Sequence, residues 1–270
     1  MYLRGVLNTI VVASGKGGVG KSTLTANLTV ALMQTGARVG LMDADLYGPC
    51  TPTLMAADGP VRYGEDGKVT PPVSYGVKII SMGLLLPKNE AAIWRGATLH
   101  KIILELLADV KWGELDYLLM DLPPGTGDVQ LTLRQSIPLT GAVIVCTPQD
   151  VALRVAYKAI LMFHRFKVPI LGIIENMSYH SCARCGQREE IFGHGGAREF
   201  SEQAEIPFLG AVPLDAAIRV QSDQGKPVAL GSGGHPAARA FHEIAGRLAA
   251  RIGIVNAARA PEREPGVARP

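Results

Sequence analysis

The 270-residue sequence has no long hydrophobic run, few cysteines and almost no excess of one charge. No apolar run reaches the roughly 18 residues that a membrane-spanning helix needs, so no membrane partner is expected. The 27 basic and 24 acidic side chains give a net charge of +3, which does not indicate a nucleic-acid-binding face. Four cysteines are too few for a disulfide scaffold and favour a reducing, cytoplasmic location.

Short apolar, β-rich runs alternate with helical patterns along most of the chain. Strands are predicted near residues 8–14, 38–45, 77–83, 116–123, 141–147, 169–176 and 206–213. Helices are predicted near residues 21–34, 98–107, 128–136, 152–166, 196–203 and 236–251. Several strands are apolar at nearly every position, which is typical of strands covered on both faces. The alternation predicts an α/β fold with a doubly wound, mostly parallel sheet and helices on both faces.

The domain organisation follows from the composition at two places. Residues 59–76 are rich in glycine and proline and are expected to form a surface excursion with a short hairpin. Residues 256–270 are rich in proline and charge, so we expect a disordered tail after a single folded domain, residues 1–255.

The stretch "GKGGVGKS" at residues 15–22 matches the phosphate-binding motif G-x-x-x-x-G-K-[S/T] at every fixed position. It follows a predicted strand and opens a predicted helix, a context that disfavours an ordinary glycine-rich turn. Glycines let backbone N–H groups point at phosphate oxygens. Lys21 is expected to neutralise the β- and γ-phosphates of ATP, and Ser22 to ligate Mg²⁺. The predicted nucleotide-binding residues here are Gly15, Lys16, Gly17, Gly18, Val19, Gly20, Lys21, Ser22 and Thr23.

Aspartates follow two of the predicted strands, and strand ends of a doubly wound sheet converge on the ligand crevice. Asp121 is expected to be the outer-sphere partner of Mg²⁺, and Asp45 to orient the attacking water. Asp43 either shares this site or only caps the loop. The loop "PPGTGD" at residues 123–128 is expected to sense the γ-phosphate through the Gly125 N–H.

The phosphate motif carries a second lysine, Lys16, that has no evident task within its own loop. The stretch "SGKGGVGKST" resembles the deviant Walker A motif of the MinD, ArsA and nitrogenase-iron-protein group of ATPases. In that group the early lysine contacts the nucleotide of the neighbouring subunit. The resemblance therefore implies that Lys16 acts catalytically across a homodimer, together with Lys21, Asp45 and Asp121.

Further segments resemble, in collinear order from about residue 8 to residue 248, the Mrp/ApbC/Nbp-type iron–sulfur cluster carriers. They include "DADLYGPCTPTLM", "WGELDYLLMDLPPGTGDVQLTL", "GIIENMSYHSCARCG" and "IFGHGG". The resemblance implies slow Mg-dependent ATP hydrolysis, a cluster received from a donor scaffold and passed to apo-proteins, and Asn176 as an adenine contact. The chain departs from the family at Cys50, where serine is common, and at Ala183, where proline is common.

Cys182 and Cys185 form a C-x₂-C pair in a predicted loop. Thiolates at this spacing can hold one metal ion or cluster, but the usual sites need four ligands. Two copies related by a two-fold axis would supply four thiolates, and the resemblance implies a [4Fe–4S] cluster bridging that homodimer. Cys146 is expected to be a small buried apolar residue and Cys50 to have a packing or loop role.

Three alternatives remain open on the sequence. Zinc could take the same four thiolates, or a local site completed by His180 or His194. A MinD/ParA-like positioning ATPase on a membrane or DNA would want an amphipathic helix or a basic face. The last predicted helix has an apolar face that could either serve this role or cover the core. A redox role like that of the nitrogenase iron protein is disfavoured by the C-x₂-C spacing.

Overall fold

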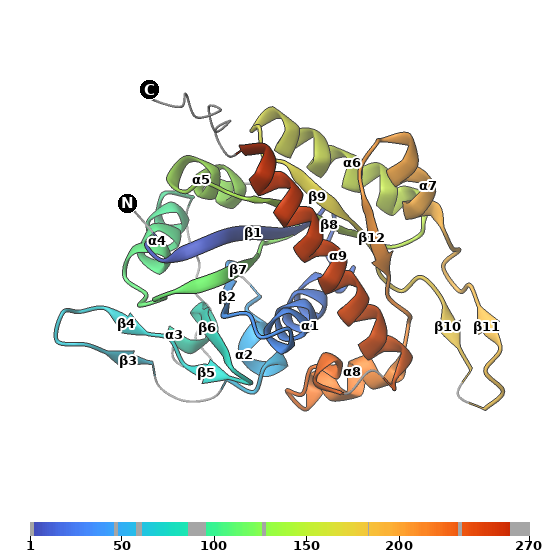
Figure 1. Cartoon of the computed structure of the whole chain (residues 1–270), viewed down its shortest axis with the longest axis horizontal. Coiled ribbons are helices and arrows are strands. Elements are labelled where there is room, and N and C mark those ends of the chain that lie inside the picture. Colours follow the sequence, from blue (N-terminus) through green and yellow to red (C-terminus); the bar gives the residue numbers. More distant parts are fainter. Residues whose placement is uncertain are drawn as a thin grey trace, which may run out of the picture.

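The computed structural model describes residues 3–45, 48–57, 61–85, 96–125, 128–182, 184–231 and 234–259. In this part of the chain an eight-stranded sheet has the order β12-β9-β8-β1-β7-β2-β6-β5 (Figure 1). Neighbouring strands run parallel except β5, which is antiparallel to β6. The strands are β1 Val6–Ser14, β2 Val39–Asp43, β5 Val73–Ser74, β6 Val77–Ser81, β7 Leu115–Asp121, β8 Gly141–Cys146, β9 Ile170–Glu175 and β12 Phe208–Ala211.

The mostly parallel sheet confirms the doubly wound fold, and its strand order determines where a ligand can bind. β1 lies between β7 and β8, so the chain extends the sheet on one side of β1 and later on the other. The crevice at such a reversal point is the usual ligand site of these folds. Asp121 at the end of β7 is in register with Val12 of β1 and with Asp43 of β2, which brings both carboxylates beside the glycine loop.

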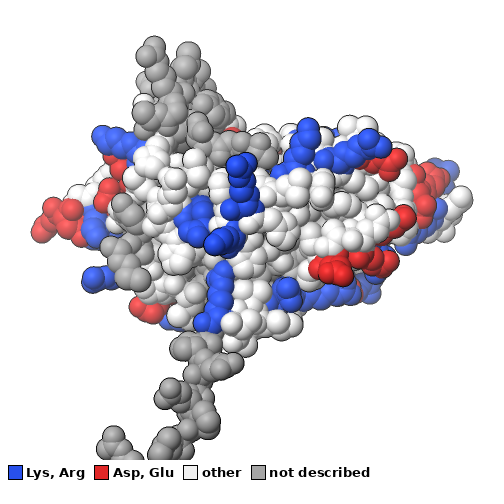
Figure 2. Space-filling model, turned by 90° about the horizontal axis from the view of Figure 1, so that it is seen from above, with Lys and Arg blue, Asp and Glu red and all other residues white. Residues whose placement is uncertain are grey.

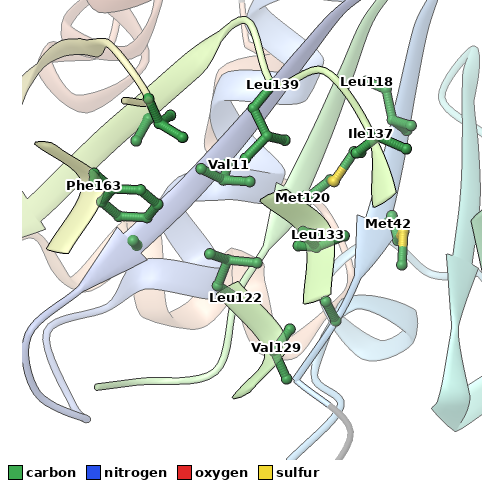
Figure 3. Close-up of a cluster of buried hydrophobic side chains, with 14 of the residues drawn as sticks. Val11, Met42, Leu118, Met120, Leu122, Val129, Leu133, Ile137, Leu139 and Phe163 are labelled. Carbon is green, nitrogen blue, oxygen red and sulfur yellow. The ribbon is translucent and has the colours of Figure 1, made fainter. Parts of the chain in front are cut away.

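Helices cover both faces of the sheet (Figure 1). Alternate residues of β1 point to opposite faces, so Val11 and Val12 belong to two separate hydrophobic clusters. The Val11 cluster, which includes Met120 and Phe163, is shown in Figure 3. It is covered by α4 (Gly96–Ala108), α5 (Asp128–Ser136), α6 (Asp150–Arg165) and α7 (Gly196–Gln203). The opposite cluster is covered by α1 (Lys21–Gln34) and α9 (Pro236–Arg259).

Shorter elements connect these layers. Two small hairpins pair β3 (Arg62–Tyr63) with β4 (Val69–Thr70) and β10 (His180–Ser181) with β11 (Arg188–Glu189). The first hairpin lies within the glycine- and proline-rich excursion, as predicted. The remaining elements are α2 (Thr51–Leu54), α3 (Met82–Leu85), α8 (Ala216–Asp223) and the 3₁₀ turn η1 (Val228–Leu230).

The last helix, α9, packs its apolar face into the core. Phe241, Ile244, Leu248 and Ile252 are at most 2% exposed. This confirms the core-covering interpretation, and it leaves that face unavailable for a membrane. No helix among the described residues is both long and apolar enough to cross a bilayer.

The same helix corrects one expected boundary. It continues to Arg259, so the first four residues of the expected tail are helical. Asn256 Nδ2 donates to Asn8 Oδ1 at 2.8 Å, and both terminal nitrogens of Arg259 donate to the Leu139 carbonyl at 3.2 Å. These contacts with residues distant in the sequence hold the last turn. The rest of the expected tail, residues 260–270, lies outside the described residues.

Candidate functional site

The phosphate-binding loop joins the end of β1 to the start of α1. Gly18 and Gly20 have φ values of +80° and +79°, which favour glycine. A Cβ atom on Gly20 would lie 2.4 Å from Asn176 Nδ2, so this part of the loop is tightly packed. The loop borders a cavity of about 290 Å³ that is also lined by Asp45, Cys50, Leu54 and Pro124. The predicted residues Lys16, Lys21, Ser22 and Thr23 all line this one cavity.

Lys21 and Asp121 form a buried ion pair below the loop. Lys21 Nζ lies 2.6 Å from Asp121 Oδ1, and the two side chains are 6% and 1% exposed. The Thr25 hydroxyl, one turn along α1, donates to the same oxygen at 3.3 Å. Burial raises the pKa of Asp121, and the charge of Lys21 opposes that shift.

The second carboxylate oxygen of Asp121 is available for a further ligand. Oδ2 is buried and has no hydrogen-bond partner among the described residues. A buried oxygen of this kind normally has a protein or water partner. Mg²⁺ prefers oxygen ligands and keeps several of its waters. The orphaned oxygen therefore fits an outer-sphere role of Asp121 toward Mg²⁺.

Asp43 organises the loop that follows β2. Its Oδ1 accepts a hydrogen bond from the Asp45 N–H at 3.1 Å, and its Oδ2 accepts from the Thr51 N–H at 3.2 Å and the Ser81 hydroxyl at 3.1 Å. Burial, then the charge of Asp121, raise the pKa of Asp43 to about 7. Of the two roles considered for Asp43, these contacts match the loop cap. Asp45, in contrast, faces the cavity.

Two predicted phosphate contacts differ in their surroundings. Lys16 is partly exposed and makes no ion pair with another described residue. The Gly125 N–H, which we expected to contact the γ-phosphate, donates to the Ser14 carbonyl at 3.1 Å. This bond ties residue 125 to the end of β1. Residues 126 and 127 of the same loop lie outside the described residues.

Asn176 lies beside the phosphate loop. Its Nδ2 donates to the Val19 carbonyl at 2.8 Å, and the residue is 8% exposed. The predicted adenine contact thus also holds the loop in place.

A network next to Asn176 was not predicted from the sequence. The Glu175 carboxylate is fully buried and accepts hydrogen bonds from the Ser178 hydroxyl at 2.5 Å and the Gly195 and Ala197 N–H groups at 3.2 and 2.8 Å. His194 Nδ1 lies 2.8 Å from the Ser178 oxygen. A charged residue closing the apolar run of β9 was the one sequence signal for this network.

The cysteine pair lies in the turn of the β10–β11 hairpin, which projects from the body of the molecule (Figure 1). The Cys182 N–H donates to the Gln187 carbonyl at 2.9 Å, and the Gly186 N–H donates to the Cys182 carbonyl at 2.8 Å. Cys182 is half-buried and Cys185 is exposed. The N–H groups of Cys185 and Arg184 lower the pKa of the Cys182 thiol. Since metals bind the thiolate form, this environment suits a metal or cluster ligand.

The other candidate ligands are engaged elsewhere. His180 Nδ1 lies 3.0 Å from the Leu214 carbonyl, and His194 faces Ser178. Within the described ranges, no three His, Cys, Asp or Glu side chains are grouped to hold a metal ion. A local zinc site completed by either histidine is therefore not found there, whereas a site shared between two copies needs only the paired thiols.

The remaining cysteines differ in environment. Cys146 is buried in β8, and burial raises its pKa to about 12, as expected of an inert core thiol. Cys50 is exposed, donates to the Gly48 carbonyl at 3.1 Å and borders the phosphate cavity. Although the residue is exposed as a whole, partial desolvation of its thiol, followed by the Asp43 charge, raises its pKa.

Charged side chains are mixed on the face shown in Figure 2. Lys and Arg lie among uncharged surface over the middle of this face, and side chains of both charges lie together toward its two ends. This distribution agrees with the near-balanced composition of the chain.

Comparisons with known proteins agree with this geometry. Residues 5–249 match the ParA family model described as NUBPL iron-transfer P-loop NTPase. A protein of Deinococcus radiodurans named iron-sulfur cluster carrier protein is 48% identical over 97% of this chain and 75% of its own length. The protein of the same name from Aquifex aeolicus is 49% identical over 89% of this chain and 67% of its own length.

Solved structures extend the likeness to the fold. A nucleotide-binding protein from Archaeoglobus fulgidus in complex with ADP has a TM-score of 0.75 and 41% identity over 84% of this chain and 90% of its own. MinD from Pyrococcus horikoshii with Mg-ADP has a TM-score of 0.69 and 25% identity over 92% of this chain and 98% of its own. The motif, the fold and these relatives agree that the chain belongs to the NUBPL-type iron-transfer P-loop NTPases of the ParA family.

Proposed function

We propose that this protein is an ATP-hydrolysing iron–sulfur cluster carrier that works as a homodimer. One observation carries the proposal: a single chain combines a full phosphate-binding motif, which lines one cavity, with two paired thiols on a projecting hairpin (Figure 1). The names of the relatives, iron-sulfur cluster carrier protein, support the same activity. The cluster is cargo, received from a donor scaffold and passed on to apo-proteins.

The nucleotide chemistry is assigned to the residues that line the phosphate cavity. Backbone N–H groups of the loop and Lys21 would hold the β- and γ-phosphates, and Ser22 with Asp121 would position Mg²⁺. Asp45 would orient the water that attacks the γ-phosphorus, so that the bond to the ADP oxygen breaks and phosphate leaves. Binding of the phosphates would require Lys21 to exchange its contact with Asp121, which is compatible with slow turnover.

Lys16 and the thiols are assigned to the dimer. Lys16 is a partly exposed cation at the cavity with no ion-pair partner among the described residues, so its charge is available to a nucleotide bound by a second copy. Cys182 and Cys185 from two chains would complete the four thiolates of a bridging [4Fe–4S] cluster. A two-fold axis through the hairpins would bring these four thiolates together, and no further protein ligand would be needed.

The test is anaerobic reconstitution of the full chain with iron and sulfide, followed by iron and sulfide assays and EPR or Mössbauer spectroscopy. Cys182→Ser and Cys185→Ser are expected to lose the cluster and to keep nucleotide binding, because the hairpin is separate from the phosphate cavity. Cys50→Ser is the matched control, since this exposed cysteine lies outside the hairpin and should leave the cluster intact.

Two results would contradict the proposal. If the hairpin variants and the wild type contain equal amounts of iron and sulfide, Cys182 and Cys185 are not the cluster ligands. Retention of zinc by the dimer, with no acid-labile sulfide after reconstitution, would favour the zinc-stabilised P-loop ATPase instead.

A further inference from the structure

A cavity of about 260 Å³ is lined by residues of β11, the second strand of the cysteine hairpin, and of α7, β12 and α9. Three arginines from three separate elements line it: Arg188 of β11, Arg198 of α7 and Arg247 of α9. Tyr179 and His194 complete its polar wall. This cavity shares no lining residue with the phosphate cavity.

Neighbouring groups hold the three guanidinium groups in place. The Arg188 Cζ lies 4.0 Å from the centroid of the Tyr179 ring, and the Arg198 Cζ lies 4.5 Å from that of Phe208. Arg247 donates from Nη1 to the Leu209 carbonyl at 3.0 Å. Stacking engages the face of a guanidinium group and leaves its N–H edges exposed. Arg188 Nη2 lies 2.9 Å from His194 Nε2, so its other N–H groups are the ones left for a ligand. The arginines are therefore partly ordered before any ligand binds.

The positive charge of the cavity is poorly compensated. Glu243 is the only carboxylate among its lining residues, and its Oε2 lies 4.0 Å from Arg247 Nη2. Both of those side chains are more than half exposed, so this pair contributes little stabilisation. Arg188 and Arg198 form no ion pair with any residue in the described ranges. Three permanent cations thus face one exposed anion.

Three small residues line the cavity together with Ile244. Gly210, Ala211 and Ala240 contribute no bulky side chain, so space remains between the arginines. Arginine side chains bind carboxylate and phosphate groups through two parallel hydrogen bonds, and clustered arginines give the strongest such sites.

We propose that this cavity is a binding site for a small anion that carries a carboxylate or phosphate group. The proposal goes beyond nucleotide hydrolysis and cluster transfer, and neither activity requires it. Arg188 is in register with Ser181, the residue before Cys182, so a bound anion would lie at the base of the cysteine hairpin.

Isothermal titration of the full chain tests this site without any iron. The P-loop is first saturated with Mg-ADP, and citrate and inorganic phosphate are then titrated separately to distinguish the two ligand chemistries. Binding of at least one anion is expected, and it should weaken with added salt. Arg188→Gln and Arg198→Gln should each weaken it by about tenfold, the equivalent of one hydrogen bond to a charged group.

Two further variants separate a built site from general attraction by charge. Arg219→Gln removes an exposed arginine of α8, outside the cavity, and should leave the affinity unchanged. Arg198→Lys keeps the charge but loses the two-pronged geometry, so it should fall between wild type and Arg198→Gln. Absence of binding of both anions to the wild type, or equal losses in Arg219→Gln and the cavity variants, would overturn the proposal.

Discussion

The Asp43 carboxyl group should make the protein less stable as the pH rises. It is 1% exposed, at the end of β2, opposite Asp121. Its pKa is raised from 3.8 to about 7 by burial and by the Asp121 charge. Between these two pH values the folded chain keeps a proton on Asp43 that the unfolded chain has lost. The free energy of unfolding therefore decreases as the pH rises through this window.

The size of the effect follows from the pKa shift. About three pKa units at about 1.4 kcal/mol each give a penalty of about 4 kcal/mol, complete above pH ~7 and absent below pH ~4. Asp43→Asn removes the titration. Its amide must turn one N–H toward the N–H of Asp45 or Thr51, which adds a cost that does not depend on pH. From pH 5 to pH 8 the variant should therefore gain roughly 3 kcal/mol relative to the wild type.

Urea unfolding followed by circular dichroism, at several pH values from 5 to 8, measures this difference. Asp223→Asn is the control, because Asp223 is 66% exposed on α8 and makes only a surface ion pair. It should shift the stability by a small amount that is the same at every pH. Stability curves of the wild type and Asp43→Asn that run parallel across this range would refute the reasoning.

Two further predictions concern the phosphate loop. Gly20→Ala should strongly weaken binding of a fluorescent ATP analogue, because its Cβ would lie 2.4 Å from Asn176 Nδ2 and displace that group from the Val19 carbonyl. Gly18→Ala has the same positive φ, but apart from the chain neighbours no atom of the described residues lies within 4 Å of the added Cβ, so it should weaken binding less. Equal binding losses in the two variants would show that backbone strain alone decides. Lys16→Ala should keep nucleotide binding and lose most phosphate release, as measured by a steady-state assay. Unchanged turnover by this variant would show that Lys16 has no catalytic role in the dimer.

The sequence predicts those helices and strands that are determined by local patterns in their own residues. The bounds of α1, α5 and α7 match the expectation, and the phosphate motif lies at the predicted strand-to-helix junction. The helix α8 was not predicted, although it is as long as α7. Its local signal is Asp215, whose side chain accepts from the Ala217 N–H at 2.8 Å.

Features built by contacts between distant segments were not predicted. The last turn of α9 depends on Asn256 reaching Asn8, and no periodicity in the tail indicates this contact. The arginine cavity combines residues from β11, α7 and α9, which are neighbours only because β12 pairs with β9. Arg188, Arg198 and Arg247 each resemble an ordinary surface residue in the sequence.

The end of β9 and the turn that follows it connect the phosphate loop with the cysteine hairpin. Asn176 holds the phosphate loop at Val19, while Glu175 and Ser178 hold the segment that carries His194. His194 in turn lies 2.9 Å from Arg188 of the cysteine hairpin. These contacts link the hairpin to the turn, so a chimaera that transplants the hairpin should include residues 175–178 and 194–197 as one module.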